Sequence, residues 1–219
     1  GINDSLFLSY TRSIEEPREG AYSSAAFLSY SVPYGWWTGS VSLSQADYAS
    51  VVDGVTRDFT TSGRSRSVSL RGERVAYRDR TRKLTLYCSL NYRDGENFVA
   101  GQLIGSSSRV QSVLDFSANL SLAAGRALWS FDAGIERGMP WFNGASDPDH
   151  LPGDAPHAQF TKFTFGAGVN TAFDARGTRI AFSSALRGQW SGNTLYTGDQ
   201  MSIAGPFAVR GYRDVRLYA

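Results

Sequence analysis

The stretch Thr81-Arg82-Lys83-Leu84-Thr85-Leu86-Tyr87-Cys88-Ser89-Leu90-Asn91-Tyr92-Arg93 decides the fold class. Apolar and polar side chains alternate in it one by one, and the apolar set is Leu84, Leu86, Cys88, Leu90 and Tyr92. Successive side chains of a β-strand point to opposite faces of a sheet. The alternation therefore predicts a strand with one apolar face and one polar face.

The same alternation recurs along most of the chain and predicts nine strands. They are expected at residues 5–12, 21–32, 36–49, 65–77, 81–93, 108–121, 126–137, 158–172 and 178–190. Short turns near residues 33, 79, 124 and 175 alternate with longer loops near residues 16, 57, 100 and 147. The longer loops include a polar one at about 50–64, a glycine-rich one at about 94–107 and a proline-rich one at 138–157.

Strand length and loop alternation favour a membrane barrel over a soluble all-β domain, which also alternates. Strands of soluble domains usually have about 5–6 residues. Strands of about 10 residues, with short turns at one end and long loops at the other, are typical of transmembrane β-barrels. Aromatic residues near the expected strand ends suit the girdles at membrane interfaces. These are Tyr10, Tyr30, Trp37, Tyr92, Trp129, Phe160 and Trp190.

The amino-acid composition excludes several classes of protein and of binding site. With 22 Lys and Arg against 20 Asp and Glu, the net charge of +2 offers no electrostatic footprint for nucleic acid. The single cysteine, Cys88, excludes an internal disulfide and a cysteine-based metal site. No apolar run reaches the length of about 18 residues that a transmembrane helix needs. We expect no cofactor.

The expected strands do not make a closed barrel by themselves. A lipid bilayer forbids an open sheet edge, and single-chain bacterial barrels usually have an even number of strands. The chain also opens with Gly1 rather than an initiator methionine. We therefore expect an excised or mature fragment with strands missing at both ends.

Eight charged residues fall on the polar faces and are candidates for the lining of a lumen. They are Arg71, Glu73, Arg93, Asp115, Asp132, Glu136, Lys162 and Arg187. They could be catalytic only if two carboxylates converged, and a hydrated pore wall with mixed ion pairs is the favoured interpretation. Gly-x-Ser-x-Gly does not occur, so we expect no enzyme and no catalytic residues.

The proline-rich loop carries both histidines beside three aspartates: His150, His157, Asp147, Asp149 and Asp154. A metal site is conceivable there, but an acidic surface loop is favoured, and we expect no metal.

Near the end of the chain stands Val209-Arg210-Gly211-Tyr212. Glycine permits a tight bend, and a guanidinium can hold a carboxylate bidentately. Alone, such a motif is most often an ordinary surface turn. Our hypothesis is that Arg210 anchors a long loop in a lumen.

Several segments together resemble the barrel of the two-partner secretion transporters, the TpsB branch of the Omp85 superfamily. They are residues 3–10, 29–37, 63–66, 159–162, 188–190, 199–205 and 209–212. Within this branch the resemblance is greatest to the transporters of filamentous haemagglutinin. Haemolysin transporter-activators and contact-dependent-inhibition transporters are near neighbours.

The resemblance implies a 16-stranded barrel preceded by a helix and two periplasmic POTRA domains, with the present strands as the third to eleventh. Residues 1–191 would be the central strands. Residues 192–219 would begin the long sixth extracellular loop, which folds into the lumen with Val209-Arg210-Gly211-Tyr212 at its tip. Arg210 would pair with an acidic residue on a later strand. Ala204-Gly205 departs from the Gly-Gly common in the family.

The implied function is a protein-conducting pore of the bacterial outer membrane. It would export one large β-helical exoprotein of the TpsA type, such as an adhesin, haemagglutinin or haemolysin, from the periplasm to the cell surface. Its partners would be this exoprotein and outer-membrane lipids. The alternative is an Omp85-type assembly factor like BamA, which shares an RGY or RGF loop.

Overall fold

The computed structural model describes residues 3–13, 21–52, 59–105 and 107–201. Within them the chain forms ten β-strands and one short 3-10 helix. The strands are β1 (Ser5–Arg12), β2 (Tyr22–Tyr34), β3 (Trp37–Val52), β4 (Phe59–Arg78), β5 (Arg82–Val99), β6 (Gln102–Leu103), β7 (Arg109–Ala124), β8 (Ala127–Met139), β9 (Thr161–Ala175) and β10 (Thr178–Ser191); the helix is η1 (Thr197–Asp199). No helix of the described residues is long and apolar enough to cross a membrane.

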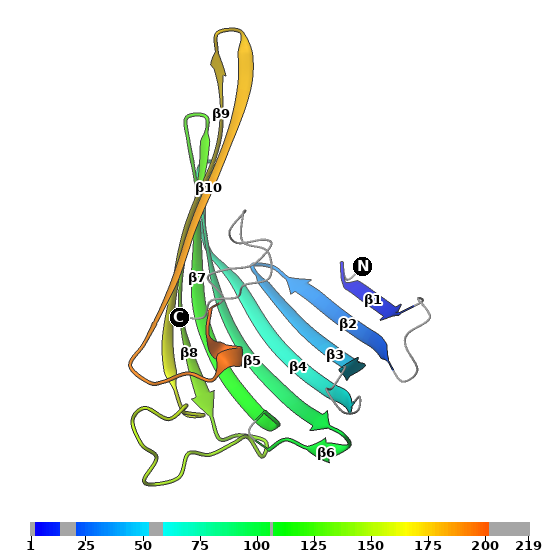
Figure 1. Ribbon diagram of the computed structural model, residues 1–219. Helices are drawn as coiled ribbons and strands as arrows, with labels where there is room; N and C mark the ends of the chain where they lie inside the picture. Colours follow the sequence, from blue (N-terminus) through cyan, green and yellow to red (C-terminus); the bar gives the residue numbers. More distant parts are fainter. Residues whose placement is uncertain (1–2, 14–20, 53–58, 106, 202–219) are drawn as a thin grey trace. The chain divides into compact units, whose positions relative to one another are not determined.

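The strands are hydrogen-bonded in the order of the chain, β1-β2-β3-β4-β5-β7-β8-β9-β10, and β6 pairs with β5. Pairs such as β1–β2 and β9–β10 are antiparallel. The latter pair forms one long hairpin (Figure 1). All nine predicted strands are present, and the two-residue β6 is the single addition among the described residues.

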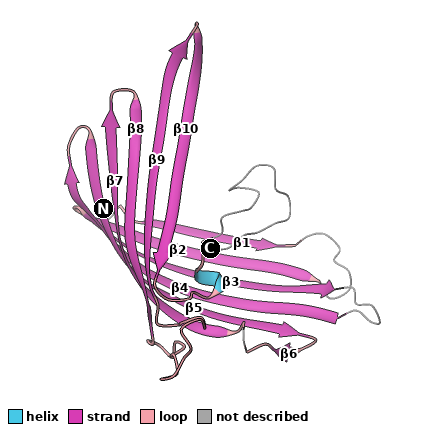
Figure 2. Ribbon diagram, turned by 60° about the vertical axis from the view of Figure 1, so that its left-hand side comes forward, coloured by secondary structure: helices cyan, strands magenta, loops and turns pink. Residues whose placement is uncertain are grey.

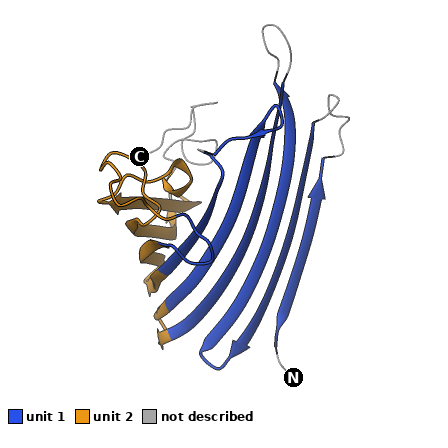
Figure 3. Cartoon of the chain, turned by 90° about the horizontal axis from the view of Figure 1, so that it is seen from below, with its two compact units in different colours: residues 1–75, 86–115, 139–145 blue, residues 76–85, 116–138, 146–219 orange. Residues whose placement is uncertain are grey.

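Contacts divide the chain into two compact units, drawn in different colours in Figure 3. The first unit comprises residues 1–75, 86–115 and 139–145, and the second comprises residues 76–85, 116–138 and 146–219. Strands β1, β2 and β3 therefore belong wholly to the first unit, and β9 and β10 belong wholly to the second.

Strands β1 to β4 of the first unit lie side by side, as Figure 2 shows, and their register separates the two faces. One row across them consists of Leu8, Leu28, Leu43 and Val68, each directly opposite the next. The neighbouring rows, on the opposite face, carry serines that hydrogen-bond across strands. These bonds join the hydroxyls of Ser29 and Ser42 at 3.1 Å and of Ser44 and Ser67 at 2.7 Å.

The apolar faces of both units stay uncovered. Leu8 is 73% exposed in the first unit, and Phe165 is 52% exposed in the second. Among the described residues, the buried apolar side chains are only Ala49, Ala158, Phe160 and Leu195. A water-soluble domain buries its apolar face against another layer, so this exposure is what strands in contact with lipid require.

Two predicted loops are shorter than expected. β3 extends to Val52 and β4 begins at Phe59, so the two strands include most of the residues expected in the 50–64 loop. β5 continues to Val99 and turns back into β6, where the sequence predicted a loop over 94–107. The glycines predicted this loop, but Asn97 continues the strand and is held by the Ser108 hydroxyl, which accepts its N–H at 2.8 Å.

Three short turns lie in the second unit, between β4 and β5, β7 and β8, and β9 and β10. The first is built around Asp79, whose Oδ1 accepts the backbone N–H groups of Thr81 and Arg82, each at 2.7 Å. The Tyr77 hydroxyl donates to its Oδ2 at 2.9 Å. Hydrogen bonds from the Thr81 backbone and from Tyr77 lower the pKa of Asp79 to about 2. In the other two turns Gly125 and Gly177 adopt φ of 58° and 80°, which other residues rarely adopt.

Gly138, near the end of β8, is a position where a side chain does not fit. Its N–H donates to the Phe160 carbonyl at 3.0 Å, and a Cβ there would overlap the carbonyl oxygen of Ala158. We expect Gly138→Ala to lower the stability of the folded protein by about 1–3 kcal/mol, because packed backbone must move. The measurement is the temperature at which the folded, heat-modifiable band disappears on gels.

Gly39→Ala is the matched control, since Gly39 lies in β3 where an added Cβ would meet nothing within 4 Å. Its transition temperature should stay unchanged or rise slightly, because alanine restricts the unfolded chain. Equal temperatures for the two variants would contradict the close approach at Gly138.

Candidate functional site

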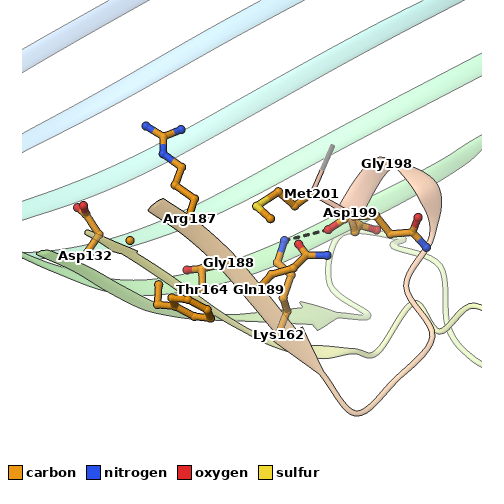
Figure 4. A pocket seen from close by; sticks show the side chains of 12 residues that line it. Asp132, Lys162, Thr164, Arg187, Gly188, Gln189, Gly198, Asp199 and Met201 are labelled. Carbon is orange, nitrogen blue, oxygen red and sulfur yellow. Dashed lines mark hydrogen bonds between the residues drawn. The ribbon is translucent and has the colours of Figure 1, made fainter. Parts of the chain in front are cut away.

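Four of the eight candidate residues share the polar face of β8, β9 and β10 in the second unit. Asp132 and Arg187 are both register partners of Gly166, so the three form one row across the strands. Glu136 lies directly opposite Lys162 in the next part of the same face. Figure 4 shows Asp132, Lys162 and Arg187 around one groove. The register thus puts these four residues on one face of the strands, and their place in a lumen stays a prediction.

Lys162 is the best-connected charge of this face. Its Nζ lies 2.8 Å from Glu136 Oε2 and donates to the Asp199 carbonyl at 3.1 Å. Its side chain is only 10% exposed, and its Nζ lies 5.9 Å from the centre of the Phe160 ring. A charge removed from water is costly unless it is paired and hydrogen-bonded. Lys162 meets both conditions, and it joins the strands to the segment that follows them.

That segment, residues 192–201, folds back along the base of β9. The Asn193 Oδ1 accepts the Thr161 N–H at 3.2 Å, and the Ser191 hydroxyl donates to the Thr161 carbonyl at 2.9 Å. Leu195 is buried, and its carbonyl accepts a hydrogen bond from the Gln200 side chain at 2.9 Å. Asn193 thus ties the segment to β9 in addition to Lys162, and the bond between Gln200 and Leu195 holds the segment itself together.

The proline-rich loop packs against the same segment. Asp147 orders it by accepting the backbone N–H groups of Ala158 at 2.7 Å and Gln159 at 3.0 Å. The His157 backbone N–H donates to the Thr194 carbonyl at 2.9 Å. Phe160 is fully buried here, so its predicted place in an aromatic girdle was wrong. Ala158 and Leu195 are buried as well.

Among the loop carboxylates, Asp147 has structural partners. Asp147 Oδ2 lies 3.3 Å from His157 Nδ1, while Asp149, His150 and Asp154 are exposed. No group of three His, Cys, Asp or Glu side chains in the described part of the chain could hold a metal ion.

A groove of about 480 Å³ lies between the polar face and the returning segment (Figure 4). The strands contribute Asp132, Lys162 and Arg187 to it, and the segment contributes Asp199 and Met201. Charged side chains of both signs line the groove, and they do not converge on a single point. Such a wall is suited to hydrated contact with a polar surface rather than to binding one small ion.

The first unit carries the other four candidates. The Arg71 guanidinium lies 4.2 Å from the centre of the Tyr87 ring, and Asp115 accepts a hydrogen bond from Ser89 at 3.5 Å. Glu73 is opposite Thr38, and Arg93 is exposed on β5. These residues lie along strands rather than around a single point.

The motif Val209, Arg210, Gly211 and Tyr212 lies outside the described residues. The sequence singled out this motif but missed the Lys162 contact to Asp199. The only signal for that contact was that Lys162 is one of two lysines in the chain, on a polar strand face.

We expect Lys162→Met to loosen the returning segment, because Glu136 and the Asp199 carbonyl both lose their cation. Charge-assisted hydrogen bonds are worth about 2 kcal/mol, which corresponds to roughly thirtyfold faster opening. Hydrogen exchange of peptides from 192–201 measures it. Lys83→Met, at the other lysine, should leave those peptides unchanged, and Lys162→Arg should restore most of the protection. Unchanged exchange in Lys162→Met would refute the anchoring role.

Comparison with known proteins shows which family the chain resembles. The family model of haemolysin secretion/activation proteins ShlB/FhaC/HecB matches residues 1–219. The outer membrane transporter CdiB of Dickeya dadantii (strain 3937) is 33% identical over 187 residues, which cover 84% of this chain and 32% of that protein. The outer membrane transporter CdiB-2 of Burkholderia pseudomallei (strain 1026b) is 27% identical over 221 residues, which cover 100% of this chain and 37% of that protein.

The solved structure of CdiB from Escherichia coli matches with a TM-score of 0.90 and 25% identity, over 99% of this chain and 40% of that one. This match confirms the predicted fold class, an antiparallel all-β segment of a transmembrane barrel. The chain spans about a third of the length of the curated relatives it matches. The match over its whole length shows that the chain belongs to the ShlB/FhaC/HecB family of haemolysin secretion and activation proteins.

Proposed function

We propose that the chain forms part of the wall of a bacterial outer-membrane transporter for two-partner secretion. The transporter moves one large β-helical exoprotein, of the adhesin, haemagglutinin or haemolysin type, from the periplasm to the cell surface. The observation that carries this proposal is the family match over residues 1–219, and relatives named outer membrane transporters support the location.

The two faces of the strands fit this role. One face exposes apolar side chains such as Leu43 and Phe165, which suit contact with outer-membrane lipids. The other carries serines and charges of both signs, which suit a hydrated lumen through which an unfolded polar chain passes. Export of this kind requires no catalytic group. The carboxylates of Glu136 and Asp147 have structural partners, so we assign no enzymatic activity.

The returning segment supports a loop that enters the lumen. Residues 192–201 fold onto the polar face of β9 and are held there by Lys162 and Asn193. We assign residues 192–219 to the start of this loop. Its guanidinium anchor is Arg210, which pairs with a carboxylate on a strand later in the full-length protein. The eight charged candidates of the polar faces, from Arg71 to Arg187, line the lumen.

The assembly-factor alternative shares the arginine motif but is the weaker proposal. The family model describes secretion and activation proteins, and the first relatives are named transporters. An assembly factor would be needed for the folding of many outer-membrane proteins. A transporter would be needed only for its own exoprotein.

The decisive experiment is secretion by the full-length protein, co-expressed with the exoprotein encoded beside it. We expect exoprotein in the medium with the native transporter and a loss of at least about tenfold with Arg210→Ala, because a lost charge-assisted bidentate pair is worth more than about 1.4 kcal/mol. Arg216→Ala, six residues further along, is the matched control and should secrete normally.

The amount of folded transporter in the outer membrane must be equal in all strains. Secretion that survives Arg210→Ala would discard the anchor but keep the transporter. Absence of exported protein with the native chain, together with loss of other outer-membrane proteins on deletion, would instead identify an assembly factor.

A further inference from the structure

The short-turn end of the second unit is strongly basic, although the whole chain is nearly neutral. Residues 78–83, 126 and 174–179 hold seven basic residues against two acidic ones. The basic ones are Arg78, Arg80, Arg82, Lys83, Arg126, Arg176 and Arg179. The rest of the chain must then carry more acidic than basic residues. The charge is therefore concentrated at one end of the strands.

The two acidic residues do not neutralise this end. Both oxygens of Asp79 are occupied by the turn itself, through the N–H groups of Thr81 and Arg82 and the Tyr77 hydroxyl. Asp174 lies 3.6 Å from Arg126, but both side chains are more than half exposed, at 67% and 74%. Such a surface pair contributes little. None of the four cations at residues 78–83 forms an ion pair with another described residue.

The three turns follow one another at the same end of the strands, and the β9–β10 hairpin extends beyond the end of β8 (Figure 1). The Ala123 N–H donates to the Thr81 carbonyl at 2.7 Å, which joins the β4–β5 turn to the end of β7. The Thr171 hydroxyl donates to the Arg126 carbonyl at 3.3 Å, which joins the β7–β8 turn to the β9–β10 hairpin. Figure 2 shows the β7–β8 and β9–β10 hairpins standing side by side. The basic residues of adjacent turns are therefore neighbours along this end of the strands, and Arg126 reaches Asp174 of the last hairpin at 3.6 Å. We call the seven residues together the basic turn surface.

This surface begins where the apolar face ends. Phe173 and Ile180 are opposite each other on that face, 45% and 40% exposed. Arg176 follows them in the turn, whereas Arg179 lies opposite Asp174 on the polar face. In a strand that crosses a bilayer, charged residues just beyond the apolar band lie at the level of the lipid headgroups. Short turns of outer-membrane barrels face the periplasm, so these headgroups belong to glycerophospholipids of the periplasmic leaflet.

We propose that the basic turn surface binds the phosphate headgroups of anionic glycerophospholipids such as phosphatidylglycerol. Six of its seven cations are arginines, whose planar guanidinium holds a phosphate bidentately. The adjoining exposed Phe173 and Ile180 supply contacts for acyl chains, which an acidic protein partner would not need. The inference rests on the membrane location in the proposed function, but not on export.

The test uses the full-length protein in neutral detergent, titrated with phosphatidylglycerol or phosphatidylcholine. Native mass spectrometry counts the bound lipids. The test variant is Arg78→Gln, Arg80→Gln and Arg82→Gln combined. The matched control replaces Arg12, Arg66 and Arg137 by glutamine, three exposed arginines of the strand halves nearer the long loops. Heat-modifiable migration shows that each variant is folded.

We expect the native protein and the control to prefer phosphatidylglycerol, and the test variant to bind it at least about tenfold more weakly. Each cation near an anionic leaflet is worth about fivefold in binding, and screening reduces the total for three. For the native protein alone, the preference should fade in about 1 M salt, a result that does not depend on any variant folding.

Four outcomes would overturn the proposal. The first is equal binding of the two lipids by the native protein, and the second is an equal loss of phosphatidylglycerol binding in the test and control variants. The third is full competition by soluble glycerol phosphate. The fourth is normal lipid binding by a test variant that no longer secretes the exoprotein. The last outcome would assign the surface to an acidic protein partner. Loss of lipid preference with normal secretion supports the proposal and leaves the transporter function intact, so the two can fail separately.

Discussion

Every structural feature of this chain depends on the pairing of backbone N–H and C=O groups between neighbouring strands. In a hydrocarbon surrounding no water can replace these bonds, so each strand must be paired along its length and must show lipid one face only. The serine row across β2, β3 and β4 and the leucine row beside it are the result. Alternation with period two is the only sequence pattern that satisfies both faces at once. It explains why so few apolar side chains are buried in the described residues.

This constraint also explains what the sequence could predict. Alternation is local, so the residues from Leu84 to Tyr92 sufficed to identify β5 and its two faces. The same pattern predicted a polar face for Lys162, which lies opposite Glu136. Turn chemistry predicted less well. Asp94-Gly95 has the composition of a turn, yet β5 passes through it because Asn97 finds partners beyond the hairpin. Glycine signals that a turn is permitted, whereas a strand ends only where its hydrogen-bonding partner ends.

The candidate site shows the limit of local patterns more clearly. Lys162 was assigned to the polar face correctly, but its partner Asp199 belongs to a segment 37 residues later, whose path no periodicity encodes. Phe160 looked like an interfacial aromatic because it lies near the start of the expected strand 158–172. It is fully buried instead, next to Ala158, whose N–H is held by Asp147 of the loop. Contacts between loops are set by which segments meet, and one sequence read alone does not contain that information.

The two ends of the strands of the second unit are stabilised in different ways. At the long-loop end, Asp147 and Lys162 have internal polar partners and Phe160 is fully buried. At the short-turn end, Asp79 satisfies its own turn and the surrounding arginines remain exposed. A cluster of like charges without internal partners repels itself, so it is tolerated only where water or an external anion screens it. The order of the first end is therefore intrinsic to the chain, whereas the electrostatic free energy of the second end depends on what surrounds it.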